Sequence, residues 1–212
     1  MANWCSTNIT FHSENKEQII KLHSVLSELD VGESLLPNDF GNLWLGNILH
    51  RFGYKWQEIT CRGLITLLGS VYEDADGHFY FEIEEEDAWA PMTEVWDTVL
   101  SEEEYSDIEI SYIAEEPGCE VYQKHGMWYE EKYYLDDETD LLNGGNSYFI
   151  TDKDLVKTVK KQIKNYLQSV DSDNIFDKNI KITTIEDIYT FIEKFNEEYP
   201  DMFLSLHEFE EV

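Results

Sequence analysis

The chain has 212 residues, with 45 acidic and 15 basic side chains and a formal net charge of −30. This charge disfavours proteins that hold nucleic acid or anionic membranes by general electrostatic attraction, because phosphates and acidic lipids would be repelled. Apolar residues make up 42% and aromatic residues 14%, enough large apolar surface for a core and unlike a disordered acidic tail. We therefore expect a folded acidic protein that contacts neither nucleic acid nor membrane directly.

The acidity is concentrated in residues 71–147, where 24 acidic side chains stand against two basic ones, Lys124 and Lys132. The net charge of this third of the chain is −22. Proteins usually mix the signs of their surface charge, because self-repulsion of one sign destabilises a compact state. The local excess indicates a basic partner or bound cations.

Cysteine usage and hydropathy indicate the compartment. The three cysteines are an odd number without CxxC spacing. The first residues lack the basic segment and apolar run of a secretory signal, and no stretch approaches the roughly 18–20 apolar residues of a membrane span. We expect a cytoplasmic protein with reduced thiols.

The first 60 residues predict a strand, a helix and an ordered insertion. Residues 4–12 alternate with the two-residue period of a strand. Ser13 is expected to cap a helix that continues to about residue 29, because apolar residues recur there at helical spacing. Residues 31–60 are less regular but carry scattered large apolar anchors, which indicates an ordered inserted segment.

A hairpin, a helix and two strands are expected next. Asp76-Gly77 is a strong turn signal between two apolar runs, and Pro91 favours the first position of a helix. The expected elements are strands over 62–72, 78–87, 107–114 and 119–124, and a helix over 91–100. The order strand, helix, strand, strand, helix, strand predicts an α+β, ferredoxin-like split βαβ sandwich, with both helices on one face of the sheet and the other face open.

Residues 127–212 predict a C-terminal strand-helix extension, either a separate unit or part of one domain with residues 1–126. Thr151 with Asp154, and Thr184 with Asp187, have the spacing of capping boxes that begin two helices. The other elements expected here are strands over 127–135, 148–150 and 203–209, and a loop over 136–146.

Three short motifs resemble those of a known family. They stand in the family's order: Asn3-Trp4-Cys5 at the start, Ala88-Trp89-Ala90-Pro91 before the second helix, and Glu115-Glu116-Pro117-Gly118 after the fourth strand. With them the chain resembles, over about residues 1–125, the YubB-like ferredoxin-like domain family of phage, plasmid and integrative-element proteins. The resemblance implies a ferredoxin-like fold and a mobile-element context, and it implies no established activity.

The third predicted strand carries a row of carboxylates opposite its apolar face. Residues on one face of a strand lie about 6.6–6.8 Å apart, close to two phosphate steps of about 3.4 Å along one DNA strand. Tyr80 is the only aromatic residue expected on that face of the strand, which argues against base stacking as in RNA-recognition sheets. The residues expected to bind a partner are Glu82, Glu84, Glu86, Glu103, Glu109 and Glu115.

The leading hypothesis is a non-enzymatic protein that binds a basic, nucleic-acid-handling protein by charge complementarity. In its fullest form the surface is a nucleic-acid mimic that inhibits host defence. One alternative is an accessory protein whose acidity serves only solubility, since charged runs are commonly solvated faces. The other is a small hydrolase or metal-dependent module of unknown substrate.

Motifs for catalysis, cofactors and metals are weak. No HExxH, GxSxG, phosphate-loop or GxGxxG pattern occurs, so we assign no catalytic residue and no cofactor. Asp74-Ala75-Asp76-Gly77 begins like a calcium loop, but Phe79 stands at the sixth position where glycine belongs. Residues 136–140 offer a loose Ca²⁺ or Mg²⁺ site whose simpler interpretation is an exposed loop, and no metal ligand is assigned.

Lysines gather on the helix predicted over 152–168. They are Lys153, Lys157, Lys160, Lys161 and Lys164. A solvated helix face explains them simply. The alternative is docking onto the acidic half, within one chain or between two copies as a head-to-tail homodimer, which salt would weaken because exposed charges are screened beyond about 8 Å.

Overall fold

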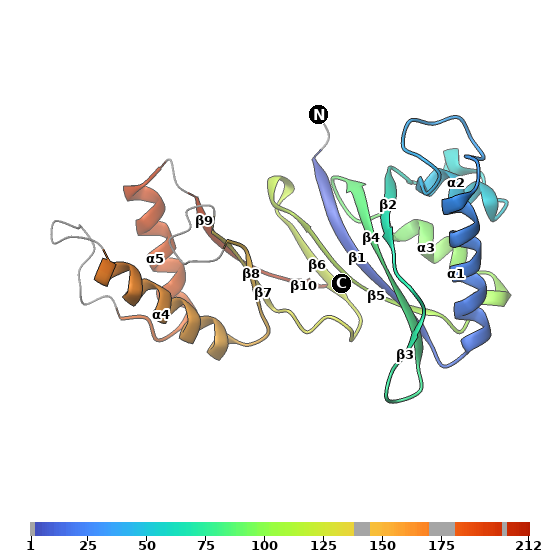
Figure 1. Ribbon diagram of the computed structural model, residues 1–212. Helices are drawn as coiled ribbons and strands as arrows, with labels where there is room; N and C mark the ends of the chain where they lie inside the picture. The colour runs from blue at the N-terminus through green and yellow to red at the C-terminus, as the bar shows by residue number, and fades with distance from the viewer. Residues whose placement is uncertain (1–2, 138–144, 170–180, 201–202) are drawn as a thin grey trace. The chain divides into compact units, whose positions relative to one another are not determined.

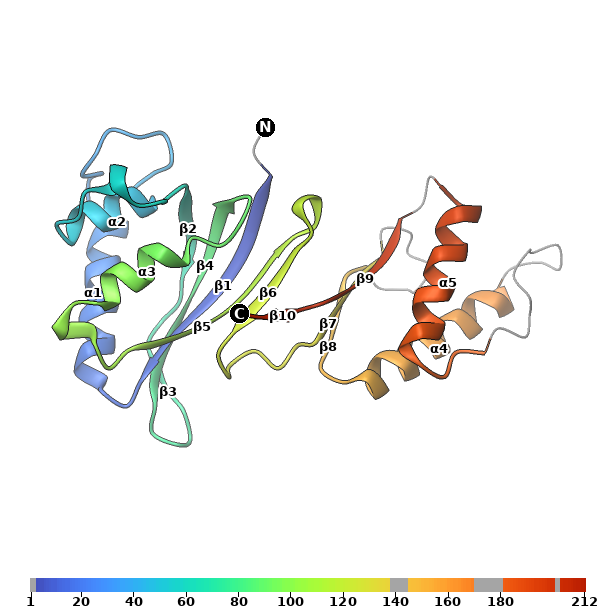
Figure 2. The same cartoon turned by 180° about the vertical axis from the view of Figure 1, so that it is seen from behind.

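The computed structural model describes residues 3–137, 145–169, 181–200 and 203–212. Contacts divide the chain into unit 1, which is Met1–Tyr129 with Glu210–Val212, and unit 2, which is Glu130–Phe209. The described residues form an α+β protein with five α-helices, a mixed sheet of seven strands and an antiparallel sheet of three (Figures 1 and 2). The predicted α+β class is confirmed.

Unit 1 contains the seven-strand sheet. Its path runs β10-β6-β5-β1-β4-β2, with β3 paired to β4. Neighbours are antiparallel except β10 and β6, which run parallel. The strands are β1 (Trp4–Ser13), β2 (Gly63–Leu68), β3 (Tyr72–Glu73), β4 (Phe79–Ala88), β5 (Glu109–Glu116), β6 (Val121–His125) and β10 (Glu210–Glu211).

Three helices of unit 1 cover one face of this sheet (Figures 1 and 2). They are α1 (Lys16–Val31), α2 (Leu45–Arg51) and α3 (Thr93–Leu100). Among the residues described for unit 1, no helix lies on the opposite face, which we call the open face. The layer of helices therefore leaves one side of β1, β4 and β5 without helical cover from their own unit.

The start of α1 corrects one prediction. Asn15, and not Ser13, is the N-cap, and its side chain accepts a hydrogen bond from the Gln18 amide. Ser13 ends β1, where its hydroxyl donates to the Asp107 carbonyl at 2.8 Å and accepts from the Asn15 amide. Ser13 was a reasonable candidate because serine is a good cap, but a bond to a residue far along the chain holds it in the strand.

The core of unit 1 lies between the sheet and the helices. Phe11 of β1 stacks on Phe81 of β4, and Trp96 of α3 meets Phe11 edge-on, with ring centroids 4.8 Å apart in both pairs. All three side chains are buried. Burying a side chain of this size stabilises a fold by roughly 1.5–3 kcal/mol, so these rings anchor α3 against the sheet.

The inserted segment 31–60 is ordered and contains α2 and a short 3-10 turn, η1 (Trp56–Glu58). Trp44, just before α2, packs edge-on against Trp56 with centroids 5.1 Å apart and forms an isolated bridge with Leu64 of β2. The insertion thus extends the core beside the β2 edge.

Unit 2 pairs a small antiparallel sheet, in the order β8-β7-β9, with two helices. Its elements are β7 (Tyr133–Asp137), β8 (Ser147–Phe149), α4 (Asp152–Ser169), α5 (Ile185–Glu198) and β9 (Leu204–Glu208). The expected capping box of Thr184 and Asp187 is present at α5, and at the start of α4 the Thr151 hydroxyl accepts from the Asp154 amide at 3.2 Å while donating to its carboxylate. These caps define where both helices begin.

Two predicted boundaries were wrong. The strand expected over 127–135 begins only at Tyr133, and Asp136 and Asp137, expected to open a loop, belong to β7 and are buried. The contacts divide the two units after Tyr129, and the last three residues belong to unit 1. No helix in the described part of the chain combines the length and apolarity needed to cross a bilayer.

Candidate partner-binding surface

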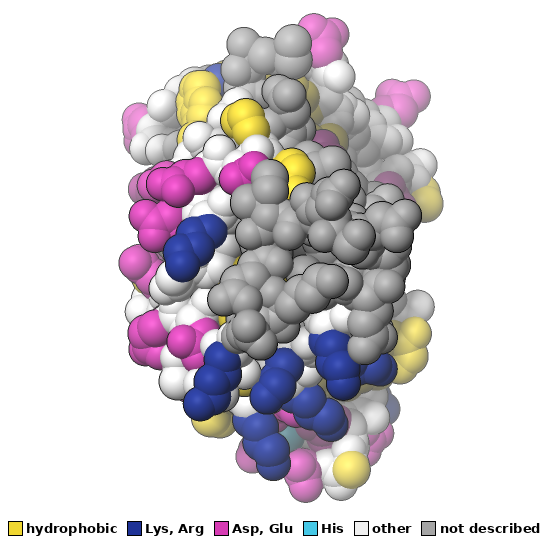
Figure 3. Space-filling view, turned by 90° about the vertical axis from the view of Figure 1, so that its left-hand side faces the viewer, with side chains coloured by type: hydrophobic (Ala, Val, Ile, Leu, Met, Phe, Trp, Pro, Cys, Tyr) yellow, Lys and Arg dark blue, Asp and Glu magenta, His cyan; other side chains and the backbone are white. Residues whose placement is uncertain are grey.

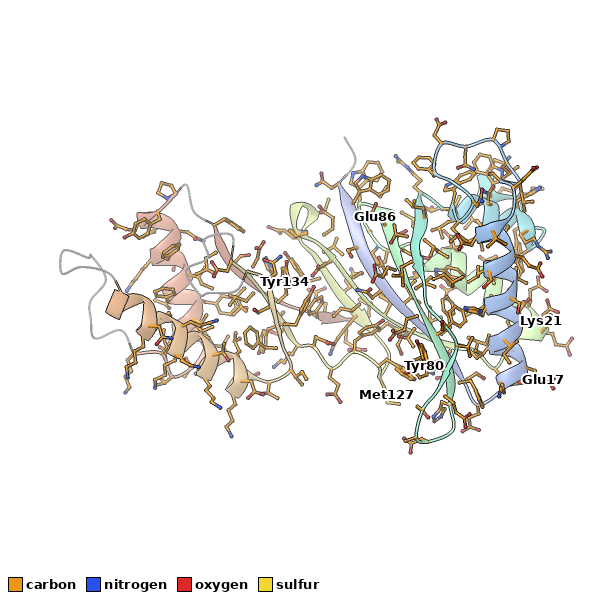
Figure 4. The ribbon with its side chains drawn as sticks, in the orientation of Figure 1. Glu17, Lys21, Tyr80, Glu86, Met127 and Tyr134 are labelled. Carbon is orange, nitrogen blue, oxygen red and sulfur yellow. The ribbon has the colours of Figure 1, made fainter. Side chains whose placement is uncertain are left out.

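β4 presents its side chains alternately to the two faces of the sheet. Glu82, Glu84 and Glu86 are exposed on the open face, while Phe81 and Ile83 are buried under the helices. The alternation follows from the pleat, which points successive side chains in opposite directions. Figure 4 shows Glu86 towards one end of β4 and Tyr80 towards the other.

The register of β1 brings further acidic residues onto this face. Ser6 is paired with Glu86 on one side and with Glu115 on the other, and His12 is paired in the same way with Tyr80 and Glu109. Residues directly opposite one another share a face of the sheet. The acidic face, as we call it, therefore consists of Glu82, Glu84, Glu86, Glu109 and Glu115.

Glu103, the sixth predicted binding residue, lies elsewhere. It begins the 3-10 turn η2 (Glu103–Tyr105), which packs against α1 and α3 in the helix layer. Its side chain is exposed, and the neighbouring Glu104 pairs with Lys21 of α1. Glu103 thus lies on the opposite side of the sheet from the acidic face. The sequence could not predict this, because a turn has no strand periodicity that would indicate which layer it joins.

An aromatic ladder crosses the open face at the Tyr80 end of β4. Ring centroids lie 5.8 Å apart between Tyr72 and Tyr80, 4.7 Å between Tyr80 and Trp128, and 5.3 Å between Trp128 and His12. These four residues come from β3, β4, the segment after β6, and β1. Tyr80 is the only aromatic residue that β4 places on this face, as the sequence predicted. Tyr72, Trp128 and His12 reach the same face from other segments.

The sequence interpretation missed Trp128 because residues 127–135 resemble one strand. Residues 126–129 instead leave β6 and cross β1, where the Tyr129 hydroxyl lies 3.1 Å from the Thr10 hydroxyl. Thr10 is only 1% exposed although it faces the open side. The sequence signal that was missed is the glycine at position 126. Its φ is +78°, a conformation that favours glycine and ends the strand.

A groove of about 1150 Å³ adjoins the ladder. Side chains from the end of β1, the β3–β4 turn, the start of β5 and residues 125–128 line it. The lining includes Trp128 and three histidines but no lysine or arginine. Its carboxylates are Glu14, Asp74, Asp76, Asp107 and Glu109. Carboxylates beside aromatic rings favour a cationic occupant.

Three of these carboxylates are engaged within the protein, and the Glu14 carboxylate lies 3.8 Å from His78 Nε2. Backbone amides of His78 and Asp76 donate to the Asp74 carboxylate at 2.9 Å, and these bonds, that of His78 first, lower the pKa of Asp74. The Asp107 carboxylate accepts from Asn15 at 2.8 Å and from Gln18 at 3.1 Å. Glu109 and Asp76 are exposed, and neither carboxylate has a hydrogen bond or ion pair with a described residue.

The Asp74–Gly77 turn does not build a metal centre with its neighbours. Asp74 closes the turn by accepting amide hydrogen bonds, and the strand β4 follows at once. Across the described ranges, no group of three or more His, Cys, Asp or Glu side chains is arranged to hold a metal ion. Residues 138–140 of the other candidate loop lie outside the described residues.

A serine–histidine contact in the groove resembles a nucleophile and its base. His12 Nε2 lies 3.2 Å from Ser111 Oγ, and Glu109 is paired with His12 across the strands. Ser111 is fully buried, however, and a Cβ on Gly126 would lie 2.2 Å from its Oγ. The backbone of Gly126 thus occupies the space that a substrate would need, so this contact holds the fold together.

The cysteines are not activated thiols. Cys5 and Cys61 are buried, and burial raises the pKa of Cys5 to about 12 and that of Cys61 above its ordinary value. Cys119 is exposed, and a hydrogen bond with Glu116 raises its pKa. Because the thiolate is the nucleophile, none of the three has the depressed pKa of a catalytic cysteine.

A second pair of carboxyls lies on the inner face of β4. Glu85 and Asp87 are buried under the helices. Glu85 Oε1 accepts from the Trp96 indole at 2.8 Å, while Asp87 Oδ2 accepts from the Thr7 hydroxyl at 3.0 Å and the Met92 amide at 3.2 Å. The strand period predicts that residues 85 and 87 share the apolar face of 81 and 83, a signal that the sequence interpretation did not use.

Burial disfavours two negative charges on this pair of carboxyls. Glu85 Oε2 and Asp87 Oδ1 have no donor group facing them, and the carboxyls hydrogen-bond to one another. Burial, and then the charge of Asp87, raises the pKa of Glu85 well above its ordinary value, and burial raises the pKa of Asp87 to about 7. We conclude that Glu85 is protonated and donates to Asp87, since a charge left buried without a partner would be costly.

The lysines of α4 form a separate basic surface on unit 2. Five of them are exposed, and none makes an ion pair with a described residue. Figure 3 shows Lys and Arg side chains gathered on this side of the molecule. A groove of about 750 Å³ lies between α4 and the start of α5 and is lined by Lys153, Lys157 and Lys160 among others. This chain therefore carries basic as well as acidic surfaces.

Comparison with protein-family models, with curated proteins and with solved structures found no match to this chain. No relative therefore assigns a role to any residue of the acidic face or the groove. Arguments about function start from the geometry and charge of these two surfaces.

Proposed function

We propose that this chain is a non-enzymatic protein that binds a basic, nucleic-acid-handling protein through its acidic face. The observation that carries the proposal is the row of Glu82, Glu84 and Glu86, exposed on the face that none of the described helices of unit 1 covers. Glu109 and Glu115 widen the row across β1. In its fullest form the surface is a nucleic-acid mimic that inhibits a host defence protein in the cytoplasm.

Fold and motifs support a mobile-element origin. The antiparallel order β5-β1-β4-β2, with α1 and α3 as the connecting helices, supports a ferredoxin-like fold for this part of unit 1. The Asn3-Trp4-Cys5 start and the two later motifs support membership of the YubB-like family, which implies the same fold. The resemblance adds context and no activity.

The mechanism is electrostatic complementarity. Carboxylates about 6.6–6.8 Å apart along one strand offer a basic groove a charge spacing close to that of alternate phosphates, each about 3.4 Å from the next. Long-range attraction speeds encounter and depends on salt, and the partner's nucleic acid competes for the same groove. Binding should therefore be fast and sensitive to ionic strength.

The decisive experiment compares two triple charge reversals. Glu82→Lys, Glu84→Lys and Glu86→Lys together alter the acidic face, whereas Glu193→Lys, Glu197→Lys and Glu198→Lys make the same charge change on exposed positions of α5. A partner is captured from host lysate at low salt, purified, and titrated with each variant. We expect the first variant to lose at least about tenfold in affinity and the α5 variant to stay close to the wild type.

Competition supplies the second half of the test. Duplex DNA or RNA that the purified partner binds should displace the wild-type protein, and high salt should weaken the complex. If both triple variants bind equally well, or if nucleic acid and this protein bind the partner together, the proposed function is wrong. Circular dichroism of each variant verifies that the fold is intact.

A head-to-tail homodimer is a second mode of association that one observation favours. The five exposed lysines of α4 have no ion pair with described residues, and the acidic face of another copy offers the opposite charge. A dimer of this kind would form at low salt and dissociate as salt rises. Sedimentation at two ionic strengths tests it, and a monomer at both would exclude it.

A further inference from the structure

The groove beside the aromatic ladder combines negative charge with a partly exposed aromatic surface. Five carboxylates line it, with three histidines and no lysine or arginine. Trp128 belongs both to the lining and to the ladder, between His12 and Tyr80. Met127, next to it, is 94% exposed and lies near Tyr80 in Figure 4. Such a site favours an occupant that is positively charged and has a flat apolar surface.

Among protein side chains, arginine fits this description better than lysine. A guanidinium is planar, stacks on aromatic rings and is weakly hydrated, and its fork of donors matches a carboxylate with two parallel hydrogen bonds. An ammonium is a compact, strongly hydrated charge that gains less from stacking. The carboxylates of Glu109 and Asp76 are exposed and have no hydrogen bond or ion pair with a described residue, so both can accept from a bound guanidinium.

A nucleobase would also stack on these rings, but the groove disfavours it. Single-stranded nucleic acid is held by basic residues that follow the backbone, beside the aromatic platform. The lining here has five carboxylates and no lysine or arginine, and it would repel each phosphate next to a stacked base. The charge of the groove therefore separates the two occupants.

We propose that this groove binds an arginine side chain of the basic partner, with the guanidinium stacked on Trp128 and hydrogen-bonded to Glu109 and Asp76. The inference rests on the proposed function and deepens it, because the acidic face attracts a basic surface and the groove selects one residue of it. Attraction by the row of glutamates is common to lysine and arginine. Selection by the groove is specific to arginine.

The test uses the full chain and two short peptides, one alternating glycine with arginine and one alternating glycine with lysine. Calorimetric titration of the wild-type protein should show that the arginine peptide binds at least about fivefold more tightly. Trp128→Leu should weaken the arginine peptide about fivefold and remove the preference. Glu109→Gln should weaken the arginine peptide about threefold.

The matched control is Trp4→Leu. Trp4 is 44% exposed and lies on the same face of β1 as His12, at the far end of the strand, so the change removes an exposed indole without touching the groove. This variant should bind both peptides as the wild type does. Should Trp128→Leu fail to fold, the pair Glu109→Gln with Asp76→Asn takes its place, since both side chains are exposed.

Equal binding of the two peptides to the wild type would overturn the inference, as would a preference that survives the loss of Trp128. Binding of a single-stranded oligonucleotide that Trp128→Leu abolishes would overturn it in favour of base stacking. These results are independent of the partner experiment. The wild-type protein can prefer the arginine peptide even if the partner experiment finds no competition with nucleic acid. Conversely, reversal of Glu82, Glu84 and Glu86 can abolish partner binding even if the two peptides bind equally.

Discussion

The two faces of β4 carry the same chemical group in opposite states. Glu82, Glu84 and Glu86 are exposed to water on the open face, whereas Glu85 and Asp87 are buried among the aromatic residues under the helices. Water stabilises the outer carboxylates as anions. Burial raises the pKa of both inner carboxyls, and the hydrogen bond between them replaces the missing water.

A count of acidic residues therefore overstates the charge of the protein surface, because it includes carboxyls that are buried. The formal net charge of −30 assigns one unit to each carboxyl, including a buried glutamic acid that is neutral here. The outer residues are the ones that a partner can meet. The inner residues serve the fold, since they tie β4 to β1 and to the start of α3.

The largest expected difference between the faces is in stability. Asp87→Ala removes the acceptor for Thr7 and Met92, and it should lower the free energy of unfolding by about 2–4 kcal/mol. Glu86→Ala, one residue earlier, should change it by no more than about 0.5 kcal/mol. All six tryptophans lie in unit 1, so urea unfolding followed by tryptophan fluorescence measures this unit. Equal effects of the two changes would contradict the assignment of the faces.

Gly63→Ala should act through the same buried pair. A Cβ at Gly63 would lie 1.9 Å from Asp87 Oδ1, so the substitution must displace the carboxyl, and we expect a loss of about 1–3 kcal/mol. In the Asp87→Ala background the clash with the carboxyl is gone and only Leu45 Cδ1, at 2.9 Å, remains close, so the same change should cost clearly less. A double-mutant cycle measures this coupling, and strict additivity would show that the two residues are independent.

The pH dependence of stability should also distinguish the inner face. The unfolded chain releases the protons of Glu85 and Asp87 near their ordinary pKa values of 4.5 and 3.8, while in the folded chain burial raises the pKa of Asp87 to about 7 and that of Glu85 well above its ordinary value. A raised pKa gives stability that is complete below the unfolded pKa and is lost as pH rises through the folded one.

We therefore expect the unfolding free energy of the wild type to fall between about pH 4.5 and pH 7. Substituting Glu85→Gln and Asp87→Asn together removes both titrating groups. The decrease in unfolding free energy over this pH range should then be smaller by at least about 1 kcal/mol. Urea titrations at several pH values measure the two slopes. The outer carboxylates are the same in both proteins, so their repulsion contributes equally to the two slopes. Parallel slopes would therefore mean that Glu85 and Asp87 take up no proton on folding.

The smallest expected effect belongs to the outer face. Replacing Glu82, Glu84 and Glu86 with glutamine relieves repulsion between like charges, and it should raise the free energy of unfolding by about 0.5–1 kcal/mol at low salt. The gain should shrink at high salt, because exposed charges are screened. A loss of stability, or a gain that salt does not change, would indicate that these carboxylates have partners in the fold.

Much of the local structure could be predicted because it depends on neighbours in the chain. The alternation of β1 and β4 follows from a two-residue period, and the cap of α5 joins residues three apart, Thr184 and Asp187. Three glutamates of β4 share a face for the same reason. Element ends were less predictable: Asn15 replaces Ser13 as the cap of α1, and β7 begins at Tyr133, because bonds to distant residues move these limits.

The groove and its aromatic ladder were beyond prediction from local pattern. Trp128 contacts Tyr80 and His12, which are far from it in the chain, and the hydroxyls of Tyr129 and Thr10 meet across a similar distance. The pairing of β10 with β6 also joins two segments of unit 1 that are separated in the chain by the whole of unit 2. A period along the chain carries no information on which remote segments will meet.

The amino-acid order alone thus specifies an acidic α+β chain with a strand whose glutamates share a side, because period and charge are properties of adjacent residues. Folding in three dimensions decides which carboxyls keep a proton, that Glu103 lies in the helix layer, and that Trp128 lies beside a groove without lysine or arginine. These outcomes depend on burial and on contacts between distant segments. Solvation and packing at each carboxyl, rather than its presence in the sequence, separate a surface that can bind a partner from a pair that holds the core.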